Sequence, residues 1–495
     1  MKNKSLEILF TIVLIDVLLL VVSFVPRMFS NENDINIRIL DWDQITDFKV
    51  SENSETAESL INSYIADDSA LSFRLKRINL SGFEPRKNNF LENPTNKNIY
   101  ALDDFFSSLS EQNKNEIIRI LHYGDSQLEG DRITCYLRNS FQEKFGGSGL
   151  GFVPFDDIAD NVNLVRYCTP NWIRYTVFHN RYGCGYYGLS GNVYKFSHYA
   201  VKKTLDTLSD NTSDTSGVKL NKEIFYNSAT VGFTIKPYVS FSSVRLMYGR
   251  AYENCEMAIY NQYTGEKILS ETLPAVDGFT IHDLKIPSSV KSFKMEFSGN
   301  VSPDFYGLLF EGTNGIQVDN YAIRGHSGDG LLKINTEYLA KQLKQLNVKL
   351  IIFQYGNNVV PYAGTDAKRE ELYNMYTSIF KRFKSVAPEI SILVVGAGDM
   401  STKINGEYIS YPYLSKVRDL QKKAAIESGC AFWDLYEVMG GENSVLTWKK
   451  KNLASCDGHF SNKGQKIIGN ELFNALLTEY NQYVFRHKNK KGIKI

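Results

Sequence analysis

The sequence predicts an α/β fold in which a parallel sheet, covered by helices on both faces, is interrupted by an inserted all-β sandwich. Continuous apolar strands alternate with amphipathic helices near the start and the end of the folded part, as expected for a parallel sheet buried on both sides. The stretch between them has short alternating runs rich in Tyr, Phe, Ser, Thr and Gly, which favour antiparallel strands. An apolar segment at the start of the chain adds a predicted N-terminal transmembrane helix.

Residues 1–28 are predicted to be a signal anchor. Lys2 and Lys4 precede an apolar stretch over residues 6–25, which as a helix would be roughly 30 Å long, enough to span a bilayer. Asp16 is an unusual residue inside such a stretch. No A-x-A-like cleavage site follows, so we expect an uncleaved anchor rather than a cleaved signal peptide. The lysines then stay in the cytoplasm, and the rest of the chain lies outside, on the periplasmic or cell-surface side of the inner membrane.

Patterns along the chain divide it into six predicted segments. A surface-loop insertion of one domain into another is tolerated, so a single α/β domain can contain the sandwich. The segments are the anchor at 1–28, a polar stalk or lead-in at 29–98, the first part of the α/β domain at 99–154, the β-sandwich at 155–315, the second part of the α/β domain at 316–482 and a basic tail at 483–495.

The elements of the α/β domain follow from the spacing of apolar residues. Residues 116–124 are predicted to form a buried strand that ends in a turn, and Ile133, Leu137 and Phe141 mark one face of the next helix. The same succession returns in the second part of the domain. Its predicted strands lie at 348–353, 391–396 and 430–435, and its predicted helices at 366–383 and 419–429.

In the insert, the apolar alternation predicts strands within 229–238, 242–250, 255–263 and 288–299. Aromatic residues are frequent there, and two interpretations remain open for four tyrosines. They are candidates for stacking on sugar rings and equally for the core of the sandwich: Tyr182, Tyr186, Tyr187 and Tyr194.

Composition excludes several classes of protein. The formal net charge of +1 over 495 residues gives no field that would favour nucleic acid as a partner. The six cysteines form no C-x-x-C pair, which argues against a zinc ribbon or a thioredoxin-type motif. Cys168 and Cys184 are candidates for a disulfide in an oxidising compartment. The sequence indicates no metal site and no cofactor.

Four short polar blocks lie at strand ends or in loops, and together they contain the groups that acyl transfer needs. They are Gly124-Asp125-Ser126, Gly325, Gly356-Asn357-Asn358 and Asp457-Gly458-His459. Nucleophilic acyl transfer requires a nucleophile, a base, a group that orients the base and donors for the oxyanion. Ser126 alone is ambiguous, because Ser and Asp also begin helices as N-caps.

In this order the blocks resemble those of the SGNH, or GDSL-like, hydrolase superfamily. The phrases "GDSQLEGDR", "FQYGNNVVP" and "VVGAGDMS" are similar to a subgroup that includes peptidoglycan O-acetylesterases, whose members carry a carbohydrate-binding-module-like β-sandwich between the first and second blocks. The resemblance covers residues 116–480 and implies a flavodoxin-like parallel sheet. It also implies a site with catalytic Ser126, His459 and Asp457, and with an oxyanion hole formed by the Ser126 N–H, the Gly325 N–H and the Asn358 side chain.

Each role has a physical basis and a competitor. His459 would take the proton of Ser126 and return it to the leaving alcohol, whereas a simple surface histidine is the alternative. Asp457 departs from the commonest D-x-x-H spacing of the superfamily, although Gly458 eases an unusual turn. If Asp457 cannot reach the ring, Ser126 and His459 would form a dyad oriented by a backbone carbonyl.

Two positions of the expected oxyanion hole have alternative candidate residues, and His122 near the site needs an explanation. Gly325 directly follows a strand-like stretch, which favours it over Gly328 and Gly330, and the G-x-N pattern favours Asn358 over its neighbour Asn357. Asp125 is expected to support the turn. His122 is expected to be a packing or hydrogen-bonding histidine inside the strand.

The resemblance implies a serine esterase that hydrolyses acyl esters, O-acetyl esters above all, on a cell-envelope or other polysaccharide. Its expected partners are the O-acylated glycan and, through the N-terminal helix, the membrane. The first alternative is an O-acetyltransferase that uses the same triad beside a membrane acyltransferase. The second is a non-catalytic glycan-binding protein.

Overall fold

A computed structural model describes residues 89–94, 100–111, 116–201 and 223–490 of the chain. All of them belong to one unit, Leu80–Ile495. The predicted anchor and residues 29–88 of the predicted stalk lie outside the described residues. Within these ranges no helix is long and apolar enough to cross a membrane.

A six-stranded sheet forms the centre of the α/β part, in the order β1-β21-β18-β17-β2-β16. Five neighbouring strands are parallel, and the short β1 pairs antiparallel with β21 at the edge. Counted along the chain, the parallel strands have the order 2-1-3-4-5 of flavodoxin-like folds. Their bounds are β1 (Leu91–Glu92), β2 (Ile117–Gly124), β16 (Gly315–Ala322), β17 (Val348–Gln354), β18 (Ser391–Val395) and β21 (Ala431–Trp433). The predicted fold class, a parallel-stranded α/β sheet with separate antiparallel β-sheets, is therefore confirmed.

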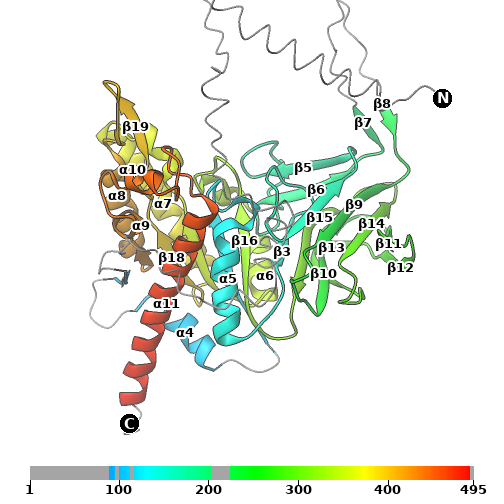
Figure 1. Ribbon diagram of the computed structural model, residues 1–495. Coiled ribbons are helices and arrows are strands. Elements are labelled where there is room, and N and C mark those ends of the chain that lie inside the picture. The colour runs from blue at the N-terminus through cyan, green and yellow to red at the C-terminus, as the bar shows by residue number, and fades with distance from the viewer. Residues whose placement is uncertain (1–88, 95–99, 112–115, 202–222, 491–495) are drawn as a thin grey trace, which may run out of the picture. The chain divides into compact units, whose positions relative to one another are not determined.

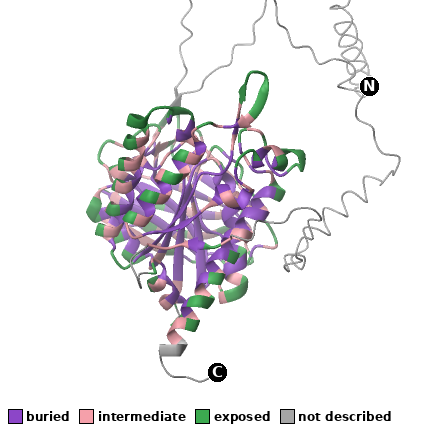
Figure 2. Ribbon diagram, turned by 90° about the vertical axis from the view of Figure 1, so that its left-hand side faces the viewer, coloured by how far each residue is buried: buried purple, intermediate pink, exposed green. Residues whose placement is uncertain are grey.

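Helices cover both faces of this sheet, because both faces of its strands are apolar. On β2, Ile118 and Ile120 pack toward one helical layer, whereas Leu121 and Tyr123 pack toward the other. Figure 2 shows these buried strands running through the centre, with exposed residues on the outer helices and loops. The first layer holds α4 (Asp103–Ser110), α5 (Arg132–Phe145), α9 (Leu435–Met439), α10 (Ser444–Lys450) and α11 (Asn462–Lys490), and the second holds α6 (Thr336–Gln345), α7 (Asp366–Val386) and α8 (Leu414–Glu427).

Two antiparallel sheets form the sandwich between β2 and β16 (Figure 1). Their facing sides enclose an aromatic core in which the rings of Phe297 and Phe305 lie 4.7 Å apart. One sheet contains β3 (Gly151–Val153), β5 (Trp172–Thr176), β6 (Asn192–Phe196), β10 (Ser243–Ala251), β13 (Val276–Leu284) and β15 (Asp304–Glu311). The other contains β4 (Leu164–Cys168), β9 (Ala229–Ile235), β11 (Cys255–Asn261), β12 (Lys267–Leu273) and β14 (Ser292–Ser298). β3 lies before the predicted start of the insert at residue 155 and already pairs with β15.

A buried ionic cluster joins the sandwich to the central sheet. Arg119 on β2 donates to both carboxylate oxygens of Asp319 on β16, at 2.9 and 2.8 Å, and pairs with Glu311 on β15. Arg245 on β10 binds the second oxygen of Glu311 at 2.7 Å. Because each buried charge has an opposite partner, the cluster fixes the sandwich against the strand that leads to Ser126.

Several features differ from the sequence-based expectations. Residues 483–490 of the predicted tail continue α11, where Tyr483 is buried against α4. A hairpin of β19 (Ser401–Ile404) and β20 (Glu407–Ser410) turns at Asn405-Gly406, and β7 (Tyr199–Val201) pairs with β8 (Glu223–Phe225). The Cys168–Cys184 disulfide is not formed, since both thiols are free. Of the four tyrosines, Tyr187 and Tyr194 are buried in the core.

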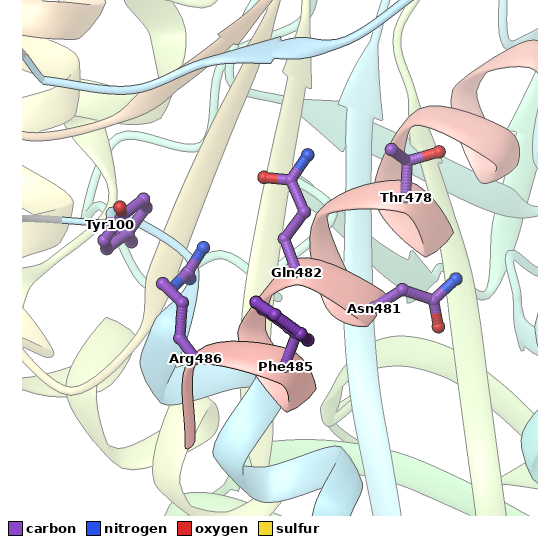
Figure 3. A pocket seen from close by; sticks show the side chains of 6 residues that line it. All are labelled: Tyr100, Thr478, Asn481, Gln482, Phe485 and Arg486. Atoms are coloured by element: carbon purple, nitrogen blue, oxygen red, sulfur yellow. The ribbon is translucent and has the colours of Figure 1, made fainter. Parts of the chain in front are cut away.

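The last turns of α11 carry a surface cavity of about 540 Å³ (Figure 3). Arg486 lies over the ring of Tyr100, 3.4 Å from its centroid, and donates to Asp103 at 2.7 Å. The cavity is lined by Tyr100, Thr478, Asn481, Gln482, Phe485 and Arg486. None of these residues belongs to the four polar blocks.

Candidate active site

The four polar blocks follow strands or helices whose ends meet at the carboxyl edge of the parallel sheet. Ser126 follows β2, and Asn358 follows β17, at the start of the 3₁₀ turn Asn357–Tyr362. β2 and β17 are neighbours, with Gln354 opposite Gly124. In the 2-1-3-4-5 order, these two strands form the switch point where open α/β sheets bind ligands.

The turn that presents Ser126 is tightly enclosed. A Cβ atom on Gly124 would lie 2.5 Å from Leu128 Cδ1 and 2.9 Å from the Gln354 carbonyl oxygen, so only glycine fits there. Asp125 is buried, its Oδ1 accepts from the Gln127 N–H at 3.0 Å, and its carbonyl accepts from the Leu128 N–H at 3.1 Å. The next helix, α5, has Asp131 at its N-cap position, so Ser126 does not cap it.

The side chains of Ser126, His459 and Asp457 are linked by hydrogen bonds in that order. Ser126 Oγ is 2.8 Å from His459 Nε2, and His459 Nδ1 is 3.0 Å from Asp457 Oδ2. A carboxylate can only accept, so Asp457 selects the tautomer with its proton on Nδ1. Nε2 is then free to accept from the hydroxyl of Ser126, which is the arrangement that a serine nucleophile requires. The alternative, a dyad of Ser126 and His459 oriented by a backbone carbonyl, was expected only if Asp457 could not reach the ring. Asp457 does reach it.

A left-handed glycine allows the one-residue spacing between Asp457 and His459. Gly458 has φ of 87°, and a Cβ atom there would lie 3.0 Å from Met400 Cβ and 3.1 Å from the Asp399 carbonyl oxygen. This bend returns Asp457 to the side of the ring, and its Oδ1 also accepts from the His459 N–H at 3.3 Å. The D-x-x-H spacing is therefore not needed here.

Asp457 is ionised at lower pH than an ordinary carboxyl. Partial burial acts to raise its pKa, but hydrogen bonds from the Ser455 hydroxyl and the His459 N–H, together with the His459 ring, lower the pKa below its usual value. The carboxylate form that orients His459 is thereby favoured.

Gln127 ties the serine turn to the histidine loop, and sequence reasoning did not single it out. Its Nε2 donates to the Gly458 carbonyl at 2.9 Å, and its Oε1 accepts from the Phe460 N–H at 3.4 Å. The side chain thus holds the backbone on both sides of His459. Its position directly after Ser126 in "GDSQ" was the signal in the sequence that could have identified Gln127 as part of the site.

Asn358 lies between the residues that neighbour Ser126 and Gly325. Its Nδ2 donates to Asp125 Oδ2 at 2.9 Å and to the His326 carbonyl at 3.1 Å. An amide nitrogen carries two hydrogens, and both already have acceptors here. An oxyanion would therefore share one of these hydrogens with Asp125 or with the His326 carbonyl. Asn357 instead exchanges hydrogen bonds with the backbone of Gly398, at 2.9 and 3.2 Å, which leaves Asn358 as the oxyanion candidate.

Among the described residues, no protein acceptor binds the backbone donors of the expected oxyanion hole. Within the described ranges, neither the Ser126 N–H nor the Gly325 N–H donates to another protein group. Gly325 has φ of 75°, a conformation that glycine adopts without strain. The competing Gly330 N–H is occupied by His326 Nε2 at 3.0 Å.

Two buried titratable side chains support the site. Burial raises the pKa of Asp125 to about 6, although the Gln127 N–H and His459 act to lower it. His122 is fully buried between Gln354 Oε1 at 3.0 Å and Thr134 Oγ1 at 3.1 Å, and burial lowers its pKa to about 3. It is therefore a neutral hydrogen-bonded residue of the strand, as expected. The described part of the chain contains no cluster of His, Cys, Asp and Glu suited to a metal ion.

Comparison with solved structures supports the fold. The chain shares the fold of a peptidoglycan O-acetylesterase. The similarity has a TM-score of 0.59 at 19% sequence identity, and it covers 79% of this chain and 99% of that esterase. The fold expected from the resemblance to SGNH hydrolases agrees with this similarity.

Weaker similarities involve two other esterases. An acetyl xylan esterase matches with a TM-score of 0.26 at 15% identity, over 32% of this chain and 81% of its own. A family two carbohydrate esterase from Clostridium thermocellum in complex with cellohexaose matches with a TM-score of 0.25 at 9% identity. The match covers 54% of this chain and 92% of that esterase. No protein-family profile and no curated protein sequence matches the chain.

Proposed function

We propose that this protein is an SGNH-type serine esterase that hydrolyses O-acetyl esters on a polysaccharide. The observation that carries the proposal is the hydrogen-bonded series from Ser126 Oγ through His459 to Asp457, with distances of 2.8 and 3.0 Å. The fold shared with a peptidoglycan O-acetylesterase supports acetyl esters on a glycan as the substrate class.

In the acylation half of the reaction, Ser126 Oγ attacks the ester carbonyl while His459 Nε2 takes the hydroxyl proton. The resulting oxyanion accepts hydrogen bonds from the Ser126 and Gly325 N–H groups and from Asn358. When the tetrahedral intermediate collapses, the bond to the sugar oxygen breaks, and His459 gives the proton to that oxygen. The products of this half are the free sugar hydroxyl and acetyl-Ser126.

Deacylation repeats these steps with water. His459 takes a proton from a water molecule, whose oxygen attacks the acetyl carbonyl. The bond to Ser126 Oγ breaks, His459 returns the proton to Oγ, and acetic acid leaves, which loses its remaining proton to the solvent and becomes acetate. Asp457 stays ionised throughout and stabilises the imidazolium that forms twice in each cycle.

We also propose that residues 1–28 anchor the enzyme in a membrane and that the catalytic part is extracytoplasmic. The support is the apolar stretch after Lys2 and Lys4. Fractionation of cells that express the full chain tests this proposal. Full-length protein in the membrane fraction that resists alkaline carbonate extraction is expected, and recovery in the soluble fraction would contradict it.

Acetate release from 4-nitrophenyl acetate and from O-acetylated peptidoglycan tests the enzymatic proposal. Ser126→Ala should reduce release by about 10⁴-fold or more, because the variant lacks the nucleophile. Ser385→Ala, which changes an exposed serine on α7, is the matched control and should retain activity. Wild-type turnover by a folded Ser126→Ala variant would refute the assignment of Ser126. Acetyl groups recovered mainly on added glycan instead of as free acetate would refute hydrolysis.

A further inference from the structure

The inserted sandwich contributes a loop to the edge of the candidate site. This loop joins β5 to β6 and carries Phe178, whose Cε1 lies 3.4 Å from the position that a Cβ atom on Gly325 would occupy. The ring of Phe178 also lies 5.5 Å from the ring of His326, measured between centroids. An oxyanion bound to the Gly325 N–H would be roughly 3 Å from that nitrogen, so a bound ester comes within reach of Phe178.

Hydrogen bonds within the loop hold its tip in one conformation. Thr176 Oγ1 accepts from the N–H groups of Phe178 at 3.2 Å and His179 at 2.6 Å, and the Thr176 hydroxyl donates to the His179 carbonyl at 2.7 Å. Asn180 has φ of 45°, and its Nδ2 donates to the Arg174 carbonyl at 2.8 Å. A surface that is already ordered loses little conformational entropy when it binds a ligand.

The exposed side chains of the tip suit a sugar ring. Phe178 is half-buried, and its ring lies 4.2 Å from the ring of the exposed His179. Arg181 is exposed as well, and no group in the described ranges hydrogen-bonds to the side chain of His179 or Arg181. An apolar ring beside free polar groups matches the two surfaces of a sugar, its C–H face and its hydroxyls.

His326, under Phe178, adds a buried donor without a partner. Its Nε2 accepts from the Gly330 N–H, so in the neutral ring the proton is on Nδ1. Nδ1 has no hydrogen-bond partner, although the residue is fully buried. Burial lowers the pKa of His326 to about 4, so the ring is neutral at neutral pH. The loop tip at Phe178 therefore rests beside an uncharged, fully buried ring.

Taken with the proposed esterase function, on which the inference rests, we propose that Phe178 and His179 form the subsite for the sugar ring that carries the ester. The insert thereby selects glycan esters over simple acetyl esters at the catalytic site itself. Phe178 packs on the sugar, and His179 binds its hydroxyls.

Steady-state kinetics on two substrates test this proposal. Phe178→Ala and His179→Ala should each raise KM for O-acetylated peptidoglycan about tenfold, which corresponds to ~1.4 kcal/mol of lost binding. Because 4-nitrophenyl acetate has no sugar hydroxyls, His179→Ala should leave its kcat and KM unchanged, and Phe178→Ala should affect them less than it affects the values for the glycan. Phe178→Tyr keeps the ring and should retain most of the affinity for the glycan.

The control and the opposing outcomes separate this inference from the proposed function. Tyr263→Ala removes an aromatic ring that is 79% exposed in the turn between β11 and β12, and it should alter neither substrate. Equal losses on both substrates, or unchanged glycan kinetics in both loop variants, would overturn the subsite while leaving the esterase intact. Failure of the wild-type protein to hydrolyse 4-nitrophenyl acetate would instead refute the proposed function. His179 is exposed, so its variant is expected to fold even if Phe178→Ala does not.

Discussion

The turn after β2 that carries Ser126 (the serine turn) and the loop that carries His459 (the histidine loop) come together where Ser126 Oγ lies 2.8 Å from His459 Nε2. The two segments are held in place in different ways. The serine turn continues a central strand, and its Asp125 is only 3% exposed. In the histidine loop, between α10 and α11, the side chains of His459 and Asp457 are 44% and 65% exposed. The position of Ser126 therefore follows from the packing of the sheet, whereas that of His459 depends on a few hydrogen bonds. This contrast predicts which substitutions affect catalysis most.

Among substitutions that keep Ser126 and His459, Asn358→Ala on the buried side should have the largest effect. It removes the proposed oxyanion donor and leaves Asp125 Oδ2 without its partner, so kcat should fall by about 10²–10³-fold. Asn357→Ala is the matched control, since its amide binds Gly398 instead, and it should lose much less activity. Equal losses in the two variants, measured with 4-nitrophenyl acetate, would remove Asn358 from the oxyanion hole.

On the exposed side, Asp457→Asn should lower kcat by about 10²-fold, less than the ~10⁴-fold loss known for a buried triad carboxylate. Water can reach the Nδ1 side of His459 and can replace part of the lost interaction. Rate measurements for this variant beside His459→Ala test the comparison. If both variants were equally inactive, exposure of the carboxylate would not weaken its role.

The link between the two regions is tested by Gln127→Met, which keeps the length of the side chain but removes both hydrogen bonds to the histidine loop. We expect kcat to fall about tenfold because His459 is less well aligned, with KM unchanged. The variant should also react more slowly with a fluorophosphonate while it remains folded at the assay temperature. An unaltered labelling rate would show that the loop is held without Gln127.

The smallest effect on catalysis is expected from Asp125→Asn, whose main effect is on stability. Burial raises the pKa of Asp125 from 3.8 to about 6, so between these values the native state binds more protons than the unfolded state. The free energy of unfolding should therefore decrease as pH rises from about 4 to 6, by up to ~3 kcal/mol from this group. Urea unfolding at pH 4.5 and 7 should show a weaker decrease for Asp125→Asn. An identical decrease in both proteins would contradict the raised pKa.

Sequence alone predicted the parts of the molecule that repeat a simple pattern. The central strands are apolar throughout because both faces are buried, and the amphipathic helices have 3.6-residue spacing, so both were recognisable. The hairpin at Asn405-Gly406 was missed although its Asn-Gly turn is a known signal. The helical end at 483–490 was missed because its many basic residues suggested a solvated tail.

The candidate site was predictable in its residues but not in its contacts. Ser126, Asn358 and His459 stand at strand ends or in loops with recognisable neighbours, so their convergence could be expected. The glycine at position 458 allowed an unusual turn, but its φ, which lets Asp457 reach the ring, depends on packing against Met400 and Asp399 and could not be predicted from the local sequence. The proximity of Phe178, in the β5–β6 loop, to Gly325, which follows β16, could not be predicted from the spacing of residues.

Covalent labelling with a fluorophosphonate, followed by peptide mass spectrometry, tests the central claim most directly. The account predicts one adduct, on Ser126, which forms at least about 10²-fold more slowly in His459→Ala because Ser126 Oγ then lacks its base. A folded wild-type protein without an adduct on Ser126, or with equal labelling after loss of His459, would contradict it.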